Sequence, residues 1–214
     1  MVRLNQYTKI IRGKTVLNNI DLCVSKGECI GILGRNASGK TMLLRAMAGL
    51  ILPTSGTAAV NGQTIKQGHR FPDSMGIIIE NIEFWPFMTA KETLEYLNSF
   101  RKKASSQDID HALVKSGLDP ADKRKVFKFS LGMRQKLAIA QAIFEKPDLL
   151  LLDEPTNSLD KVSRSDFYEL IRSEKKRGCT VVIASHIKED LEVCDRLIEI
   201  ENGVIDHFID SIQQ

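Results

Sequence analysis

The stretch of sequence that most constrains the fold is residues 34–41, which reads G-R-N-A-S-G-K-T. It matches the phosphate-binding loop pattern G-x-x-x-x-G-K-T. The apolar residues 29–33 before it are typical of a buried strand, and residues 41–48 after it are typical of a helix that Gly49 can end. A strand, a glycine-rich loop and a helix in this order form a phosphate site. The stretch therefore predicts an α/β fold organised around a nucleotide.

The loop and the first turn of its helix supply the groups that would hold phosphate. Successive backbone N–H groups of such a loop face inward, and the N-terminus of the helix adds a partial positive charge. We expect Lys40 to reach the β- and γ-phosphates and the Thr41 hydroxyl to bind Mg²⁺. The nucleotide-binding residues predicted in this stretch are Gly34, Arg35, Asn36, Ala37, Ser38, Gly39, Lys40, Thr41 and Met42.

A second group of candidate residues follows an apolar run. Leu149–Leu152 precede Asp153 and Glu154, which places two acids at the carboxyl end of a buried strand. Ligands of open α/β sheets bind at that end. We expect Asp153 to hold Mg²⁺, and Glu154 to orient or deprotonate a water molecule that attacks the γ-phosphate.

Periodicity and turn residues divide the rest of the chain into strands and helices. Apolar runs without alternation predict a sheet that is covered on both faces. In the second strand we expect Val16, Asn18, Ile20 and Leu22 to share one face. Strands are expected over residues 2–10, 15–24, 57–60, 75–80, 148–152, 180–184, 196–201 and 204–209, helices over 89–100, 107–116, 130–144, 163–177 and 187–194, and a surface loop over 67–74.

Three of these helices follow one another between regions where strands and helices alternate. We therefore expect one domain over residues 1–214, with its core in 1–83 and 146–214 and an inserted helical subdomain in 84–145.

Composition excludes some classes of protein. The net charge of +3 is too small to indicate nucleic-acid binding. No apolar run approaches the roughly 18 residues of a membrane-spanning helix, and residues 1–6 have no apolar signal-peptide core, so a cytosolic chain is expected. Four cysteines without C-x-x-C spacing predict buried, reduced thiols.

Further motifs occur in a fixed order after the phosphate-binding loop. Residues 129–136 read F-S-L-G-M-R-Q-K, residues 153–160 read D-E-P-T-N-S-L-D, and His186 follows the strand predicted at 180–184. From about residue 3 to about residue 209, the chain resembles the nucleotide-binding subunit of ATP-binding cassette (ABC) transporters. The resemblance implies a P-loop NTPase core with a parallel sheet, an N-terminal antiparallel β subdomain and an inserted α-helical subdomain.

The resemblance also implies an ATPase that uses ATP and Mg²⁺ and works as a head-to-tail dimer, with two nucleotides between two subunits. Ser130 and Gly132 would contact the nucleotide held by the opposite subunit, and Asp160 would lie in the loop that crosses the interface. Lys40, Glu154 and His186 would be the catalytic residues. The implied partner is an integral-membrane permease, which would hold the subunit on the inner face of the membrane.

The chain departs from the family pattern at several positions. Glu80 replaces a glutamine that binds Mg²⁺ and senses the permease, and since a carboxylate also binds Mg²⁺, we expect Glu80 to join Thr41 and Asp153 as a metal ligand. Ile11 replaces the aromatic ring that stacks on adenine, which leaves base selectivity open. Leu131 and Met133 give the signature an S-L-G-M form, which resembles subunits of ABC-2-type exporters, including peptide-antibiotic resistance systems.

The aromatic run at residues 84–87 has two interpretations. It is either a small core beneath the helical subdomain or a groove that receives a cytoplasmic helix of the permease. Among the histidines, His69, His111 and His207 are expected at the surface.

Two other functions compete with transport. Relatives that act on nucleic acid or the ribosome carry coiled-coil insertions or two cassettes in one chain, and this sequence has neither. A regulatory module that hydrolyses ATP poorly is the other alternative, because of Glu80 and Ile11. The sequence does not distinguish a homodimer from a heterodimer, and only the S-L-G-M resemblance favours export over import.

Overall fold

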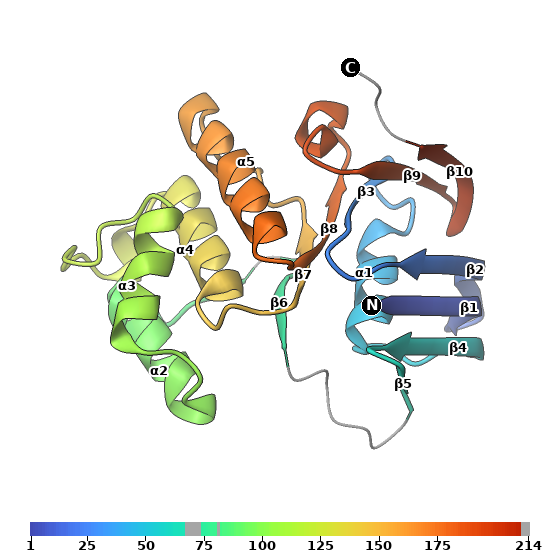
Figure 1. The fold of residues 1–214 in the computed structure, drawn as a ribbon, viewed down its shortest axis with the longest axis horizontal. Coiled ribbons are helices and arrows are strands. Elements are labelled where there is room, and N and C mark those ends of the chain that lie inside the picture. Colours follow the sequence, from blue (N-terminus) through green and yellow to red (C-terminus); the bar gives the residue numbers. More distant parts are fainter. Residues whose placement is uncertain (67–73, 81, 211–214) are drawn as a thin grey trace.

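The computed structural model describes residues 1–66, 74–80 and 82–210. A six-stranded sheet runs through the middle of the molecule, with helices against one face and a second sheet opposite the other (Figure 1). The predicted α/β fold is confirmed. Within the described ranges, no helix has the length and apolar character needed to cross a membrane.

The six-stranded sheet has the order β10-β9-β3-β8-β7-β6, and all of its pairings are parallel except the one between β9 and β10. The parallel core sheet is therefore confirmed, with an antiparallel hairpin added at one edge. Its strands are β3 (Cys29–Leu33), β6 (Met75–Ile78), β7 (Leu149–Asp153), β8 (Thr180–Ser185), β9 (Arg196–Glu201) and β10 (Val204–Asp210).

Side chains of the central strands alternate between two cores. Leu149 and Leu151 of β7 pack in the core around α1 (Lys40–Ala48), whereas Leu150 and Leu152 pack in the core beneath α4 and α5. Both sets are buried because each face of the sheet is covered, as the unbroken leucine run predicts.

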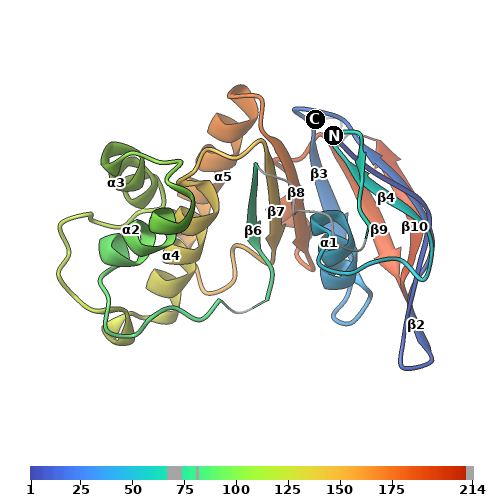
Figure 2. The ribbon, with the colours of Figure 1, turned by 90° about the horizontal axis from the view of Figure 1, so that it is seen from below.

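The second sheet is antiparallel and has the order β2-β1-β4-β5. Figure 2 shows α1 between β3 and this sheet. The helix that follows the phosphate-binding loop is thus held from both sides, and the expected N-terminal antiparallel unit is present. Its strands are β1 (Val2–Ile11), β2 (Lys14–Val24), β4 (Ser55–Val60) and β5 (Gln63–Thr64).

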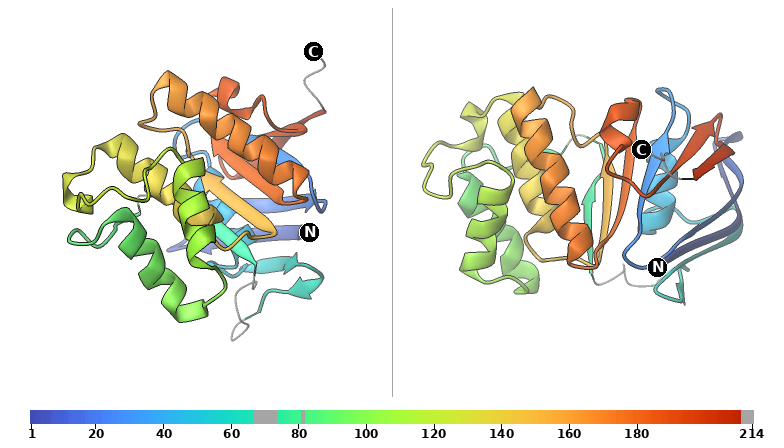
Figure 3. Two further views of the ribbon diagram at one scale, coloured as in Figure 1. Left: turned by 60° about the vertical axis from the view of Figure 1, so that its left-hand side comes forward. Right: turned by 45° about the horizontal axis from the view of Figure 1, so that its top comes forward.

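The remaining helices cover the opposite face, with α2, α3 and α4 at the end of the molecule farthest from the antiparallel sheet (Figure 3). A capping box starts α2, since the Thr89 hydroxyl accepts from the backbone N–H of Glu92 and the Glu92 carboxylate accepts from that of Thr89. These elements are α2 (Ala90–Arg101), α3 (Ser106–Lys115), η1 (Val126–Lys128), α4 (Leu131–Ile143), α5 (Lys161–Lys176) and η2 (Lys188–Leu191).

The expectation that Val16, Asn18, Ile20 and Leu22 share one face holds for Ile20 and Leu22 and is wrong for Asn18. Leu17 is buried and Asn18 is exposed, whereas Ile20 and Leu22 are buried as expected. The register between β1 and β2 shifts along this stretch, and Asn19 has a φ of +48°. One additional residue in a strand moves the side chains that follow it to the other face.

The helix expected over residues 187–194 is also wrong, because only a short 3₁₀ turn, η2, forms there. The backbone N–H of Asp195 donates to the Cys29 carbonyl at 2.7 Å, so the chain is already docking beside β3 before β9 begins. Most of the loop expected at residues 67–74 lies outside the described residues, as does His69. Cys23 is exposed, which contradicts the expectation that all four thiols are buried.

Candidate active site

The phosphate-binding loop begins α1 as predicted. Gly39 precedes the helix with a φ of +113°, a conformation that side chains rarely adopt, and a Cβ there would lie 3.2 Å from the Cα of Gly203. Ser38 and Lys40 are buried in this turn. The glycine therefore allows the loop to close tightly against the β9–β10 turn, where the Gly203 N–H donates to the Ser38 carbonyl at 2.8 Å.

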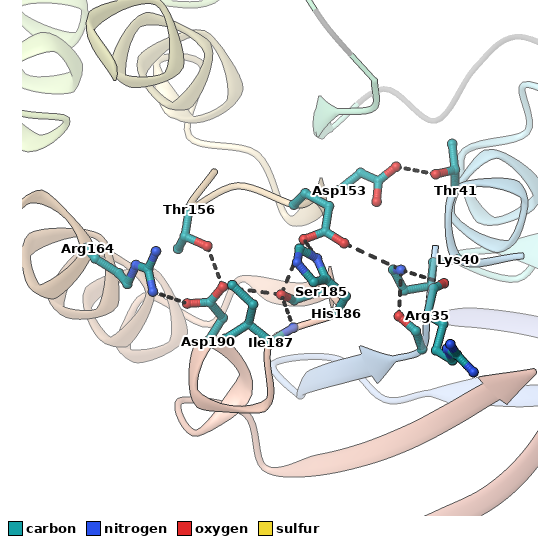
Figure 4. A network of polar contacts seen from close by, with 12 residues as sticks. Arg35, Lys40, Thr41, Asp153, Thr156, Arg164, Ser185, His186, Ile187 and Asp190 are labelled. Atoms are coloured by element: carbon teal, nitrogen blue, oxygen red, sulfur yellow. Dashed lines mark hydrogen bonds and ion pairs between the residues drawn. The ribbon is translucent and has the colours of Figure 1, made fainter. Parts of the chain in front are cut away.

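The Lys40 ammonium group lies across its own loop. Its Nζ donates to the carbonyl of Gly34 at 2.7 Å and to that of Arg35 at 3.1 Å, and it lies 3.4 Å from Glu154 Oε1 (Figure 4). A loop lysine and the acid that follows β7 therefore meet, although 114 positions separate them in the sequence.

Thr41 and Asp153 are joined directly. The Thr41 hydroxyl donates to Asp153 Oδ2 at 2.5 Å, while Asp153 Oδ1 is buried and accepts no hydrogen bond from the described residues. Burial raises the pKa of the Asp153 carboxyl, and the neighbouring Glu154 charge adds to this.

This pair fits a magnesium ion. Mg²⁺ in phosphate sites takes one or two protein oxygens and completes its shell with phosphate and water. The Thr41 hydroxyl and the free Asp153 oxygen supply such a set. No cluster of three or more acids, cysteines or histidines that could hold a metal without a nucleotide occurs in residues 1–66, 74–80 and 82–210.

Glu154 and His186 follow two neighbouring strands, β7 and β8. The His186 Nδ1 lies 2.9 Å from Glu154 Oε2, and the Ser185 hydroxyl lies 3.4 Å from the same oxygen. The Glu154 backbone has a φ of +47°, and its N–H donates to the Ala184 carbonyl at 2.8 Å. Such a backbone is strained, and it persists here because the adjacent strand holds it.

A buried carboxylate lies behind this pair. Asp190 accepts hydrogen bonds from the Thr156 hydroxyl at 2.5 Å, the Tyr168 hydroxyl at 2.6 Å and the Ser185 hydroxyl at 3.2 Å. Arg164 of α5 lies 3.7 Å from it (Figure 4). Asp190 thus connects the loop after β7, the end of β8 and α5. The role of Asp190 could not be predicted from the sequence, because an acid in a short turn gives no signal of burial.

Glu80, the predicted metal ligand, forms an ion pair with Arg45 of α1. Its side chain is 58% exposed, and its backbone has a φ of +62°. It nevertheless lines the same cavity as Thr41 and Asp153. The structure therefore brings Glu80 near the candidate metal ligands Thr41 and Asp153 but gives it a cationic partner that the sequence did not suggest.

Two cavities meet at Thr41, Asp153 and Glu154, which line both of them. The first has a volume of about 390 Å³, and its lining contains most of the predicted loop residues together with Asp153 and Glu154. Five of its lining residues were missed in the sequence: Lys14, Thr15, Val16, Asn202 and Gly203. The second, of about 500 Å³, is lined by Thr41, Ile78, Glu80, Gln135, Asp153, Glu154 and Asn157.

Five predicted nucleotide-binding residues lie outside both cavities: Gly34 and Arg35 at the start of the phosphate-binding loop, and Ser130, Gly132 and Asp160. Ser130 caps α4 by accepting from the N–H of Met133 at 3.2 Å, and Asp160 caps α5 by accepting from that of Ser163 at 2.8 Å. A Cβ at Gly132 would lie 2.8 Å from the Ser158 carbonyl oxygen, so only glycine fits there. Leu131 beside it is 70% exposed. Ser130, Gly132 and Asp160 therefore line neither cavity of their own chain.

The position expected to face adenine is aliphatic. Ile11 ends β1 and is partly exposed, whereas Tyr7 is fully buried and its hydroxyl donates to the Ile51 carbonyl at 2.9 Å. Tyr7 therefore belongs to the core and cannot replace the missing ring.

The aromatic run at residues 84–87 is divided between core and surface. Phe84 packs against the core, but Phe87 is 77% exposed, and Trp85 is also exposed. Trp85 contacts the ring of Tyr96, which contacts Phe100, and Phe87 lies beside Phe127. We define the aromatic surface as the exposed residues Trp85, Phe87, Tyr96, Phe100 and Phe127.

Comparisons with known proteins identify the family. Residues 17–157 match the family described as ABC transporter. The uncharacterized ABC transporter ATP-binding protein YybJ of Bacillus subtilis (strain 168) is 46% identical, over 95% of this chain and 94% of that protein. The bacitracin transport ATP-binding protein BcrA of Enterococcus faecalis is 38% identical, over 90% of this chain and 63% of that protein.

The fold is also that of a solved cassette. The dimeric structure of MJ0796, a bacterial ABC transporter cassette, superposes with a TM-score of 0.90 at 23% identity, over 98% of each chain. The resemblance inferred from the motifs is confirmed. The chain therefore belongs to the ABC transporter family, as one of its ATP-binding proteins.

Proposed function

We propose that this chain hydrolyses ATP to drive transport through a separate membrane permease. The observation that carries the proposal is the convergence of Lys40, Thr41, Asp153 and Glu154 at one cavity, with His186 in contact with the Glu154 carboxylate. These residues come from the phosphate-binding loop and from the ends of β7 and β8. Loop lysine, metal-binding hydroxyl, strand-end acid and histidine are the groups that phosphoryl transfer to water requires.

In the proposed mechanism each residue has a defined task. The loop N–H groups and Lys40 bind the β- and γ-phosphates. Thr41 and Asp153 would hold Mg²⁺, which neutralises charge on the phosphates. Glu154 orients the attacking water and accepts its proton. The Nδ1 of His186 hydrogen-bonds to Glu154, which leaves the other ring nitrogen free to bind the γ-phosphate.

We propose that the complete site forms between two cassettes. Ser130, Gly132 and Asp160 lie outside the cavity of their own chain, while Leu131 is exposed beside them. The N-terminus of α4 carries a partial positive charge, which suits the γ-phosphate of a nucleotide held by a second subunit. The MJ0796 cassette is described as dimeric, which supports the same arrangement here.

The permease would dock on the aromatic surface. Exposed aromatic groups of this kind are enriched at partner sites. Docking there would place the chain on the inner face of the membrane, with residues 84–145 acting as the subdomain that transmits nucleotide binding to the permease. Export is favoured by the S-L-G-M signature.

The test is ATP turnover of the purified chain with Mg²⁺, compared with Glu154→Gln and Lys40→Ala. Wild type is expected to release phosphate, Glu154→Gln to bind ATP but turn over at least about 10²-fold more slowly, and Lys40→Ala to lose ATP binding. Glu169→Gln on the exposed face of α5 is the control. Equal turnover by wild type and Glu154→Gln would refute the assigned role of Glu154, and ATP binding without any turnover would favour a regulatory module.

A further inference from the structure

The cavity that contains the metal site is acidic. Glu80, Asp153 and Glu154 all line it, and the residues that complete its lining are uncharged: Thr41, Ile78, Gln135 and Asn157. Under the proposed function, a triphosphate must approach this cavity. Three carboxylates and a polyanion repel one another, so the site needs a nearby positive charge in addition to Lys40.

Arg45 supplies a positive charge from the helix that holds the phosphate loop. It lies one turn after Thr41 on α1, and residues four positions apart share a helix face. Its guanidinium forms an ion pair with the Glu80 carboxylate. Arg45 is itself absent from the cavity lining, whereas its acidic partner is present.

The two partners are held at fixed points of the fold. Arg45 is in the last turn of α1, where its carbonyl accepts from the N–H of Leu50 at 2.9 Å. Glu80 follows β6 in a left-handed backbone conformation. β6 pairs in register with β7, the strand that ends at Asp153. A rigid helix and a rigid sheet edge thus set the approach of the guanidinium to the carboxylate.

We propose that Arg45 is a positioning residue that neutralises Glu80, so that the acidic cavity can accept a nucleoside triphosphate. The inference rests on the proposed function and goes beyond it. Arg45 acts through Glu80 and not on the phosphates. Its effect on nucleotide binding therefore depends on the carboxylate at position 80.

The experiment is a double-mutant cycle of Arg45→Met and Glu80→Gln on the full chain. The readout is the dissociation constant of a fluorescent ATP analogue measured in EDTA, so that the metal makes no contribution. In the wild-type background Arg45→Met is expected to weaken binding on the order of tenfold, because Glu80 is left uncompensated. In the Glu80→Gln background the same change should alter binding less than about threefold.

Two controls isolate the effect. Arg172→Met breaks an exposed arginine–glutamate pair on α5, outside both cavities, and should leave binding unchanged. Thermal unfolding of each variant identifies any loss of binding that comes from misfolding. Raising the salt concentration should reduce the effect of Arg45→Met, because the interaction is electrostatic and partly exposed.

The outcomes separate the two proposals. Equal binding by wild type and Arg45→Met would overturn the inference and leave the proposed function intact. Equal weakening by Arg45→Met in both backgrounds would also overturn it, because Arg45 would then act on the nucleotide directly. A folded wild-type chain that binds no ATP in EDTA or with Mg²⁺ would overturn the proposed function, and this inference with it.

Discussion

The Nδ1 atom of His186 lies 2.9 Å from the Oε2 atom of Glu154. The contact joins the residue that follows β8 to the residue that follows β7, two parallel strands paired in register. His186 therefore orients the carboxylate of Glu154, the proposed general base. A change at His186 therefore also acts on the Glu154 carboxylate.

His186→Ala is predicted to lower the turnover number for ATP on the order of 10²-fold, because Glu154 loses its orienting partner. The measurement is steady-state phosphate release over a range of ATP concentrations and pH. His111→Ala is the matched control, since that histidine is exposed on α3. A His186→Ala variant with the turnover number and pH profile of wild type would remove His186 from the mechanism.

Asp190→Ala is predicted to destabilise the protein. Thr156 and Tyr168 donate to this buried carboxylate, and without it their hydroxyl groups lose their acceptor. Each unsatisfied buried group costs about 1–3 kcal/mol of unfolding free energy. Urea unfolding followed by circular dichroism measures the loss, and Asp190→Asn, which keeps an acceptor oxygen, should lose less. Equal losses in the two variants would show that the hydrogen bonds do not matter.

Gly76→Ala is predicted to weaken the packing of α4 on β6. A Cβ at this position would lie 1.9 Å from the carbonyl oxygen of Ala142, so the helix must move away from the sheet. Overpacking of this kind costs about 1–3 kcal/mol of unfolding free energy. Thermal unfolding of Gly76→Ala beside Ser74→Ala is the measurement. An unchanged melting temperature for Gly76→Ala would mean that α4 is not held as described.

Glu92→Gln tests an electrostatic contact of the capping box. Lys125 and the Thr89 backbone N–H lower the pKa of Glu92 to about 2. A lowered pKa in the folded state stabilises the protein above the unfolded-state pKa of about 4.5, and this contribution disappears as the pH falls toward 2. Wild type should therefore be more stable than Glu92→Gln at pH 7, and the difference should shrink below pH 4.5. A difference in urea midpoint that does not vary with pH would contradict the ionic contribution.

Local sequence was sufficient for those parts of the site that depend on backbone turns and strand ends. The glycines of the phosphate loop and the acids after Leu152 use interactions within a few residues, and each is found where expected. Strand-end residues also meet predictably, because parallel strands end at the same edge of a sheet.

Contacts between distant elements were not predictable. Arg45 and Glu80 meet because α1 lies near the end of β6, and Asp190 is buried because α5 and β8 close over it. The face change in β2 depends on a local irregularity at Asn19. Neither an isolated arginine nor an isolated acid carries a pattern that identifies its partner.

The most direct test of the composite site is the mass of the Glu154→Gln variant in solution, measured by light scattering with and without ATP. The account predicts a monomer without nucleotide and a dimer with ATP, because hydrolysis is blocked and Ser130 of each subunit closes on the nucleotide of the other. Adding Ser130→Phe to Glu154→Gln should abolish the dimer without affecting ATP binding to the monomer. An ATP-bound Glu154→Gln chain that stays monomeric would contradict the account, as would a dimer that Ser130→Phe does not disturb.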